Sequence, residues 1–448
     1  MIMAMIRPDT EMKDSGIECI ESIPKGWITE RIKNLFSERN EKVDDAEPNE
    51  LLSVSEYYGV APRSEKINSD TVLVRAESLQ GYKRCEKNDL VSNIMLAWKG
   101  AMGISQYRGV VSPSYCVYTP KKGICSQYYH YLFRTDAYKG LFKKYSTGII
   151  ESRLRLYTEQ FFERRAIVPP LSEQQAIADY LDKTCSKIDE IIAEAKASIE
   201  EYKELKQSIL FETMTRGIQS DRKYKTCDYE WLGKVPEDWS LMKITHILDD
   251  NDSYPIGDGD HGLIKTDSYK SEGIPYIRVQ NIGWGTPLLM DNVVYISKED
   301  NERIKGSQLK PGDVLFVKTG ATIGKTAIVP NNIPISNTTS HVGKITVSKE
   351  HNSKYIFYLL SSFIGYKQFW DIACMKATRP ELSISEIKQM KVLIPSTRDE
   401  EDEIVEYLDN KLPEYETLIC IKESLINDLE AYKKSLIYEV VTGKRRVV

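Results

Sequence analysis

Two stretches of the chain carry apolar residues at alternating steps of four and three, the spacing of a coiled-coil seam. The first runs from Ile177 to Ile209 and the second from Ile404 to Leu436. A period of 3.5 residues over roughly five heptads predicts a long helix that packs along this stripe against a partner helix. Because both seams lie in one chain, we expect the two helices to pack against each other as an antiparallel pair.

The expected helix ends differ between the two stretches. After Pro169 and Pro170, Ser172 and Gln175 have the spacing of a capping box, which predicts the start of the first helix. The second stretch lacks this pattern and contains Pro413. Since proline has no amide to donate and clashes with the preceding turn, we expect a short helix followed by a long one.

Outside these helices the pattern changes to short apolar, β-branched runs separated by turn signals. Such runs occupy 71–74 and 314–317, with a Lys-Pro-Gly-Asp turn at 310–313. Helical periodicity is confined to 128–142 and 354–370. This mixture predicts two compact α/β domains.

The chain repeats itself. Residues 177–215 match 404–442 at a constant offset of 227, and the Ile23-Pro24 to Trp27 motif recurs 212 residues later as Val235-Pro236 to Trp239. The edges of the two halves agree while their interiors differ, which favours two diverged recognition modules on one duplicated frame.

We therefore predict an α/β fold with an internal pseudo-twofold repeat, in which two α/β domains are joined by two long antiparallel coiled-coil helices. The predicted segments are an N-terminal segment (1–26), a first recognition domain (27–170), a central helical region (171–218), a second recognition domain (219–396) and a C-terminal helical region (397–448).

The net charge of −5 hides an alternation along the chain. Basic residues outnumber acidic ones 16 to 8 over 60–160 and 17 to 13 over 255–395, but acidic residues dominate 10 to 5 over 171–212 and 13 to 5 over 398–439. The basic interiors favour contact with phosphate, and the acidic connectors favour contact with protein or solvent.

Cysteine spacing and hydropathy argue against three classes of protein: zinc-binding, disulfide-bonded and membrane-spanning. The eight cysteines form no C-x-x-C pair, so neither a zinc ribbon nor a disulfide framework is expected. No apolar run approaches the roughly 20 residues of a membrane span. We expect a protein of the cytoplasm.

Motifs for catalysis and cofactors are weak. The 320–326 segment resembles a phosphate-binding loop but has three residues between its glycines, where nucleotide binding needs four. The 257–262 segment fits G-x-G-x-x-G, yet its two aspartates would repel a pyrophosphate. The five histidines show no metal-ligand spacing, and no serine-hydrolase elbow is present. We expect no catalytic residue and no metal site.

A DNA-binding surface is the remaining candidate. Basic side chains interleaved with aromatics and amides suit phosphate positioning and readout of base edges. The candidate DNA-binding residues are Trp98, Lys99, Arg108, Tyr115 and Arg153 in the first half, and His261, Arg278, Gln280, Asn281, Lys318, Thr319, Lys325, Asn337 and Arg379 in the second. A helix of about 35 residues is roughly 50 Å long, and half-sites one DNA turn apart are separated by roughly 34 to 36 Å. The long helices are therefore a candidate ruler between two DNA half-sites.

These motifs together resemble the specificity subunit of type I restriction-modification enzymes across the whole chain. The residues that carry the resemblance are Ile23-Pro24-Lys25-Gly26-Trp27, the run from Val168 to Asp182, and Val440-Val441-Thr442-Gly443-Lys444. The pieces at 312–315 and 322–325 are similar to a recurrent part of that family's target recognition domains. The start of the second helix, at Pro395-Ser396-Thr397, departs from the family pattern.

The resemblance implies a non-catalytic subunit that reads the two halves of a split DNA target. It also implies two methyltransferase subunits that bring S-adenosylmethionine and methylate adenine, and endonuclease subunits that translocate DNA and need ATP and Mg. Two alternatives stay open at this point. One is a self-contained DNA-modifying enzyme, disfavoured by the missing catalytic motifs; the other is a coiled-coil scaffold, disfavoured by the basic, divergent interiors.

Overall fold

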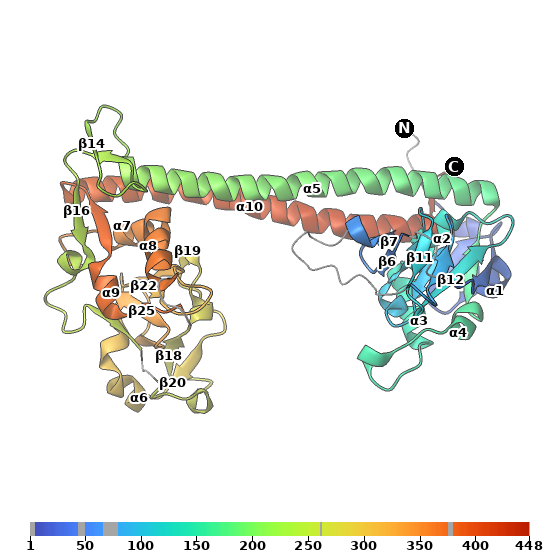
Figure 1. Ribbon diagram of the computed structural model, residues 1–448, viewed down its shortest axis with the longest axis horizontal. Helices are drawn as coiled ribbons and strands as arrows, with labels where there is room; N and C mark the ends of the chain where they lie inside the picture. The colour runs from blue at the N-terminus through green and yellow to red at the C-terminus, as the bar shows by residue number, and fades with distance from the viewer. Residues whose placement is uncertain (1–4, 44–49, 66–78, 260–261, 375–379, 448) are drawn as a thin grey trace. The chain divides into compact units, whose positions relative to one another are not determined.

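The computed structural model divides the chain into two compact units, each an α/β domain (Figure 1). Unit 1 comprises residues 1–196 and 424–448, and unit 2 comprises residues 197–423. Two long helices, α5 (Leu171–Arg216) and α10 (Arg398–Val441), each contribute to both units. The structure describes residues 5–43, 50–65, 79–259, 262–374 and 380–447. The predicted pair of α/β domains joined by two long helices is confirmed, whereas the segment boundaries above stay a prediction.

The two long helices run antiparallel, as predicted. In unit 1, Lys433 Nζ on α10 lies 2.6 Å from Asp189 Oδ2 on α5. In unit 2, Lys206 Nζ on α5 lies 2.5 Å from Glu416 Oε1 on α10. Residue numbers therefore fall along α10 as they rise along α5. Of the helices that the structure describes, none is both long and apolar enough to cross a membrane.

The buried seam keeps half of the predicted positions, such as Ile177, Leu181 and Ile188, and is displaced by one residue at the positions between them. Ile191 and Leu205 were expected in the seam but are 45% and 41% exposed, while Ile192 and Ile199 are buried. The same shift in α10 exposes three residues that the pattern placed in the seam: Leu418, Leu425 and Tyr432. Where two apolar residues are adjacent, as at Ile191 and Ile192, either one fits the apolar stripe of the helix. Packing against the partner helix, and not the local pattern, therefore decides which side chain is buried.

The expected capping box at the start of α5 is wrong. The helix begins at Leu171, one residue before the predicted cap Ser172. Glu173 Oε2 instead accepts a hydrogen bond from Trp27 Nε1 at 3.0 Å, and Gln174 Oε1 accepts one from the Cys125 amide at 3.0 Å. Polar side chains of the first turn therefore tie the helix to its domain and do not satisfy the helix's own amides.

The expected break at Pro413 is also wrong, because α10 is one helix from Arg398 to Val441. Proline removes one backbone hydrogen bond from a helix interior. The neighbouring seam residues Leu408 and Leu412 are buried, and their packing holds the helix through the proline.

The domain of unit 1 has an antiparallel sheet as its centre, covered by helices on one side (Figure 1). Six aromatic rings, each almost fully buried, form its core: Phe36, Tyr129, Phe133, Tyr138, Phe142 and Phe161. The sheet has the order β10 (Met102–Ile104), β9 (Leu90–Asn93), β12 (Tyr115–Pro120) and β5 (Phe36–Arg39). Its helices are α2 (Ser126–Phe133), α3 (Asp136–Lys144) and α4 (Thr158–Phe162).

Smaller two-stranded sheets complete unit 1. They are β2 (Met12–Ile17) with β3 (Ile20–Pro24), β4 (Ile28–Arg31) with β13 (Arg165–Val168), β6 (Leu52–Ser55) with β7 (Gly59–Pro62), and β8 (Lys83–Cys85) with β11 (Gly109–Val111). A further pair joins the two ends of the chain, because β1 (Met5–Ile6) pairs with β27 (Arg445–Arg446).

The domain of unit 2 is built around a five-stranded and a four-stranded sheet. The first has the order β17 (Ile256–Asp258), β25 (Val342–Ile345), β22 (Val314–Val317), β23 (Thr326–Ile328) and β19 (Trp284–Pro287). The second has the order β20 (Val294–Ile296), β18 (Ile274–Ile277), β24 (Ser336–Thr338) and β21 (Gln308–Leu309). The remaining pairs are β14 (Tyr224–Thr226) with β15 (Lys234–Pro236) and β16 (Ser240–Lys243) with β26 (Lys391–Ile394). Its helices are α6 (Lys298–Arg303), α7 (Ser353–Ser361), α8 (Phe363–Cys374) and α9 (Ile384–Gln389).

The two copies of the sequence repeat form equivalent hydrogen bonds between each domain and its long helix. In unit 1 the indole of Trp27 donates to Glu173, and in unit 2 the indole of Trp239 donates to Glu400 at 3.2 Å. The hydroxyl of a tyrosine on the first domain helix likewise donates to an aspartate on the long helix in each unit, at 2.6 Å and 2.5 Å: Tyr131 with Asp182, and Tyr358 with Asp409. Equivalent residues of the two repeats therefore attach each domain to its long helix.

We expect Glu400→Gln to destabilise unit 2 by about 3 kcal/mol, because it breaks a buried ion pair with Arg222. The two side chains are only 9% and 7% exposed, and Glu400 raises the pKa of the Arg222 guanidinium by accepting its hydrogen bonds. Hydrogen exchange of the β16 and β26 amides measures the loss. Glu414→Gln, which breaks an exposed pair with Lys411 on the same helix, should cost less than about 1 kcal/mol. Equal losses in the two variants would contradict the prediction.

Candidate nucleic-acid interface

A turn follows the same buried strand in each domain. In unit 1 it joins β9 to β10, and in unit 2 it joins β22 to β23. Each turn contains a left-handed glycine, Gly100 with φ 93° and Gly324 with φ 90°. A Cβ at these glycines would lie 2.7 Å from Lys139 on α3 and 3.1 Å from Tyr366 on α8, respectively. Glycine therefore lets the turn approach the helix in both domains.

A loop leads from the helix back to this turn. In unit 1 the Leu156 amide donates to the Ile94 carbonyl at 2.9 Å, and in unit 2 the Leu382 amide donates to the Lys318 carbonyl at 2.9 Å. We call the turn and this loop together the reading surface of each domain. Among the described residues, both units share the strand, the left-handed glycine and the hydrogen bond from the returning loop, whereas the side chains differ.

On the reading surface of unit 1, two cations flank one indole. Lys99 Nζ and Lys143 Nζ lie 5.1 Å and 5.0 Å from the Trp98 ring centroid. The indole N–H donates to the Met95 carbonyl, which orients the ring. Trp98 and Lys99 were predicted from the sequence, but Lys143 was missed. Lys143 comes from α3, distant in sequence from the turn, and no local motif marked it.

Of the other predicted residues of unit 1, one lies beside this cluster and two lie away from it. Arg153 is exposed in the loop after α3, one turn from Glu151, which is hydrogen-bonded to Lys143. Arg108 is exposed and lies 3.4 Å from Glu86. Tyr115 is partly buried in β12, which raises the pKa of its phenol. Only Arg153 joins Trp98 and Lys99 on the reading surface.

In unit 2 the equivalent turn is held by buried polar contacts. Lys318 Nζ lies 3.0 Å from Asp258 Oδ2 and 3.2 Å from Glu381 Oε1, and its side chain is almost fully buried. Thr319 Oγ1 lies 2.7 Å from His341 Nδ1. Both predicted residues therefore bond to protein groups, and their direct effect is to position the turn.

A row of exposed aromatic rings extends from this turn. The ammonium of Lys325 lies 6.0 Å from the Trp284 ring centroid, and Trp284 contacts Tyr366, whose ring stacks on Trp370 at 6.3 Å. Each of these rings is more than a third exposed. Lys325 was predicted; the three rings were not, because they come from β19 and α8, distant in sequence from the turn.

The remaining predicted residues of unit 2 lie elsewhere in the domain. Arg278, Gln280 and Asn281 share one short helical turn, where the side chains of Arg278 and Gln280 donate to the Asn292 carbonyl. Asn281 is buried and donates to the Leu289 and Asp291 carbonyls, and Asn337 is buried and donates to Asn301 and Ile304. His261 and Arg379 lie outside the described residues. As DNA contacts, all fourteen residues stay a prediction.

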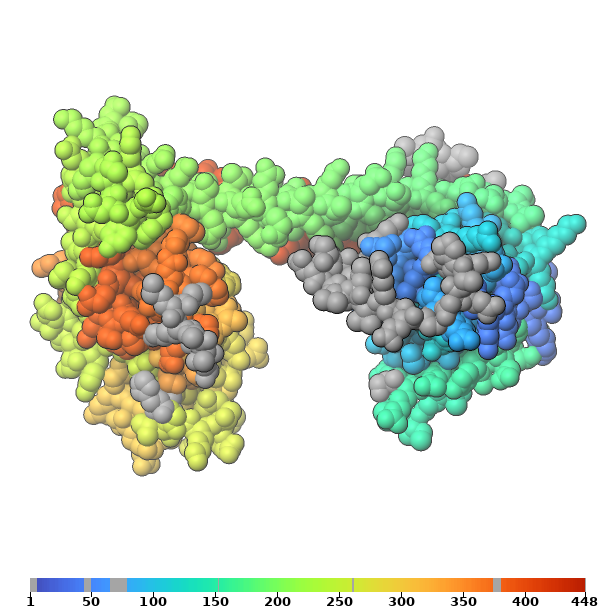
Figure 2. All heavy atoms as spheres, viewed as in Figure 1, coloured from blue at the N-terminus to red at the C-terminus, as the bar shows by residue number. Residues whose placement is uncertain are grey.

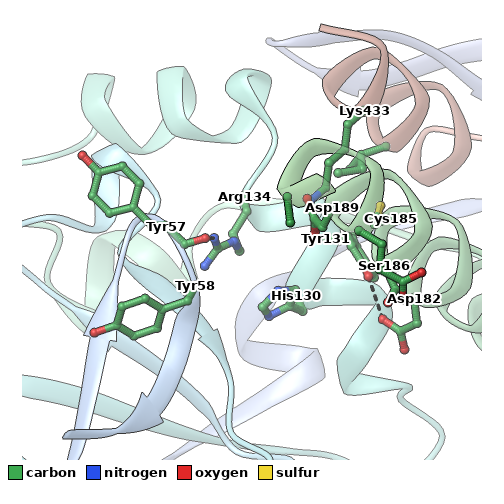
Figure 3. A pocket seen from close by; sticks show the side chains of 13 residues that line it. Tyr57, Tyr58, His130, Tyr131, Arg134, Asp182, Cys185, Ser186, Asp189 and Lys433 are labelled. Carbon is green, nitrogen blue, oxygen red and sulfur yellow. Dashed lines mark hydrogen bonds and ion pairs between the residues drawn. The ribbon is translucent and has the colours of Figure 1, made fainter. Parts of the chain in front are cut away.

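A pocket of about 760 Å³ opens where the domain of unit 1 meets its long helices (Figure 3). Figure 3 shows Asp182 from α5 bonded to Tyr131, with Lys433 from α10 on the same side of the pocket and Arg134 on the opposite side, near Tyr57 and Tyr58. The Arg134 guanidinium donates to four backbone carbonyls: Ser55, Glu56, Tyr57 and Met102. These polar groups therefore serve the attachment of the domain.

Burial keeps the imidazole and the thiol of this pocket uncharged. Burial lowers the pKa of His130 to about 3, so its imidazole stays neutral, and its Nδ1 accepts from the Ile104 amide. Burial also raises the pKa of the Cys185 thiol to about 11, so no thiolate forms. Among the described residues, no group of three or more His, Cys, Asp or Glu side chains is arranged to hold a metal ion.

Comparison with known proteins matches both halves of the chain to one family. The family model described as the type I restriction modification DNA specificity domain matches residues 24–201 and again residues 236–431. The chain belongs to this family. The two matches coincide with the two copies of the repeat, so each copy is one specificity domain.

Two curated relatives are named as specificity subunits, one matching most of this chain and one about half of it. The specificity subunit of the type I restriction enzyme MjaIX from Methanocaldococcus jannaschii is 22% identical over 431 residues, 88% of each chain. The specificity subunit of the type I restriction enzyme EcoBI from Escherichia coli is 28% identical over 248 residues, 53% of this chain and 49% of that protein.

Solved structures share the fold. A chain from a study of complex assembly and conformational transition in the type I R-M system has a TM-score of 0.68 at 13% identity, and the match covers 94% of this chain and 98% of that one. The HsdS subunit from Thermoanaerobacter tengcongensis has a TM-score of 0.52 at 13% identity, with the same coverage. The expected family is thus confirmed, and the alternatives of a self-contained enzyme and a scaffold are disfavoured.

We expect Lys99→Ala with Lys143→Ala to weaken DNA binding by the specificity chain uniformly across sequences. If each ammonium neutralises one phosphate, the slope of log K against log salt should fall in magnitude by about 2. Fluorescence anisotropy with an unrelated duplex at several salt concentrations measures this slope. Lys183→Ala with Lys187→Ala, two exposed cations on the acidic face of α5, should leave it unchanged. An equal change in both double variants would contradict the prediction.

Unit 1 should lose stability as the pH falls below about 6.5. The pKa of His130 is about 3 in the fold against an ordinary value of 6.5, so the unfolded chain binds the extra proton in this window. At pH 5 the full effect is about 2 kcal/mol, and we expect about 1 kcal/mol because the ring lines an open pocket. Denaturant unfolding at pH 7 and pH 5 measures it. His130→Gln should reduce the pH dependence, whereas His246→Gln, at an exposed position, should not.

Proposed function

We propose that this chain reads a split DNA target, one half with each domain, and directs adenine methylation and restriction by partner subunits. The observation that carries the proposal is the repeated frame with different side chains. Both reading surfaces are built by the same strand, left-handed glycine and returning loop, yet one presents Trp98 with two lysines and the other presents Lys325 with a row of rings. Two readers of different sequence specificity would have this form.

The charge of the domains supports DNA as the ligand. Basic residues exceed acidic ones two to one over 60–160, the part of unit 1 that contains its reading surface. Cations held over indole rings, as at Trp98 and Trp284, combine phosphate attraction with a flat apolar face for bases. The acid-rich long helices are unsuited to a polyanion.

The long helices are suited to protein partners. Apolar side chains displaced from the seam are exposed on them: Ile191, Leu425 and Tyr432 in unit 1, and Leu205, Leu418 and Ile421 in unit 2. Exposed apolar residues on an acidic helix favour docking of a protein surface. We propose that two methyltransferase subunits bind here, one for each copy of the repeat, and that endonuclease subunits join the same complex.

Chemistry on DNA would then belong to the partners. In the pocket of unit 1, burial lowers the pKa of the His130 imidazole and raises that of the Cys185 thiol, so both groups stay uncharged at neutral pH. We propose that S-adenosylmethionine, ATP and Mg are held by the partner subunits and that this chain is non-catalytic. The length of the paired helices would set the gap between the two half-sites.

The test is to co-express the chain with its methyltransferase subunit and to map methylated adenines by single-molecule sequencing. We expect methylation confined to a two-part motif with a fixed gap. Exchanging the domain of unit 1 for that of a relative should change one half of the motif and leave the other. A well-formed complex that methylates no specific motif would overturn the proposal and favour a scaffold, and methylation by the isolated chain would favour a self-contained enzyme.

A further inference from the structure

The loop after α3 in unit 1 is a closed hairpin. Its base is formed by Thr147 and Arg155, whose amides and carbonyls exchange two hydrogen bonds of 2.8 Å and 2.9 Å. Inside it, a Cβ at Gly148 would lie 2.6 Å from the Arg153 carbonyl oxygen, so the two arms touch. The amide of Leu156, just beyond the hairpin, donates to Ile94 in the neighbouring turn. We call residues 147–155 the wedge loop.

The tip of the wedge loop is apolar and points into solvent. Ile149 is 103% exposed and Ile150 is 50% exposed, and Ile149 is the most exposed large apolar side chain that the structure describes. In Figure 2 the blue-green segment that follows α3 projects from the lower edge of this domain. A braced loop that holds an isoleucine wholly in water gains nothing for folding, because that side chain removes no apolar area from solvent.

The base of the wedge loop is cationic. Residues 143–155 carry four basic side chains and one acidic one. That acid, Glu151, accepts a hydrogen bond from Lys143, which lowers the pKa of the carboxyl, and Lys144 pairs with Glu18. The excess positive charge of this segment therefore comes from Arg153 and Arg155. Lys99 and Trp98 lie on the other side of Lys143. An apolar tip thus stands on a basic platform.

From this arrangement we infer that Ile149 enters the DNA between two stacked bases at the half-site read by unit 1. The inference rests on the proposed function and adds a contact that acts by deforming DNA. Apolar side chains that enter the minor groove separate neighbouring bases, while basic residues on either side bind the phosphates of the opened step. Ile149 at the tip, with the exposed Arg153 and Arg155 beside it, is placed for these two roles.

A wedge of this kind reads sequence by deformability. Opening a base step costs a few kcal/mol and costs least at pyrimidine–purine steps such as TA and CA. The half-site read by unit 1, or the sequence beside it, should therefore contain such a step at the position of Ile149. This selectivity requires no hydrogen bond to a base edge, and isoleucine provides none.

The charge favours DNA over a protein partner for this tip. A protein contact would bury Ile149 against apolar groups and would have to neutralise the surrounding lysines and arginines. On DNA the same cations bind phosphates and release counterions. The exposed apolar residues of the acidic helices have the opposite surroundings, which suit protein.

The test uses the chain assembled with its methyltransferase subunits and a duplex that carries the mapped motif. Adenines across the motif are replaced one at a time by 2-aminopurine, whose fluorescence rises when it is unstacked. A methyltransferase that turns its target adenine out of the helix brightens that position and serves as an internal reference. We expect a second bright position in the half read by unit 1, present in the wild type and in Ile149→Leu, and lost in Ile149→Ala.

Ile149→Ala should also bind the motif about ten-fold more weakly, because an alanine fills less of the opened step. The matched control is Ile6→Ala, which shortens another exposed isoleucine of unit 1 and should change neither readout. A single bright position in the wild type, or a second one that survives Ile149→Ala, would overturn the wedge. Failure of the Ile149→Ala chain to assemble with the methyltransferase would also overturn it, because Ile149 would then be a protein contact.

The wedge and the proposed function can fail separately. If the wild-type complex methylates no two-part motif, the proposed function fails and the wedge fails with it. If the motif exists but no second position brightens, the proposed function stands and the wedge alone is overturned.

Discussion

The attachment of each domain to the first turn of a long helix is the interaction on which the rest of the structure depends. An indole N–H donates to a glutamate in both copies, Trp27 to Glu173 and Trp239 to Glu400. A buried tryptophan is large and rigid, and a buried carboxylate is costly unless its oxygens are bonded. Bonding one to the other fixes both the helix start and the angle of the chain that enters the domain. The neighbouring residues Gln174 and Glu401 add to this attachment, because their side chains accept hydrogen bonds from backbone amides of the domain.

In each attached domain, different residues serve stability and recognition: buried strands stabilise the domain, and exposed turns carry the side chains that differ. The strands before the reading turns, Leu90–Asn93 and Val314–Val317, are buried along their whole length. Change there would create cavities or unpaired polar groups. Both turns keep a glycine with a left-handed backbone next to the helix. Their other residues differ, since the turn of unit 2 is also held by the buried ion pairs of Lys318. Two readers of unlike surface chemistry can therefore share one architecture.

Sequence reasoning reached part of the reading surface and missed the rest for one reason. Trp98, Lys99 and Lys325 stand out because basic and aromatic residues adjoin glycines in basic stretches. Lys143, Trp284 and Tyr366 complete the same clusters, yet they belong to helices and strands whose neighbours in space are remote in sequence. For three other predicted residues the structure shows bonds within the protein. Asn281, Asn337 and Lys318 have the chemistry of base readers, but in the fold their polar atoms bond to the protein.

The sequence by itself determined the duplicated plan, the two long helices and the family, because these depend on periodicity and on repeated motifs that local order preserves. Only the tertiary structure decided which of two adjacent isoleucines enters the seam, how α5 starts, and whether Pro413 interrupts α10. Each of these is a competition between a local preference of about 1 to 3 kcal/mol and packing against a partner. The local sequence pattern does not contain the position of the packing partner, so these three features could not be predicted from the pattern.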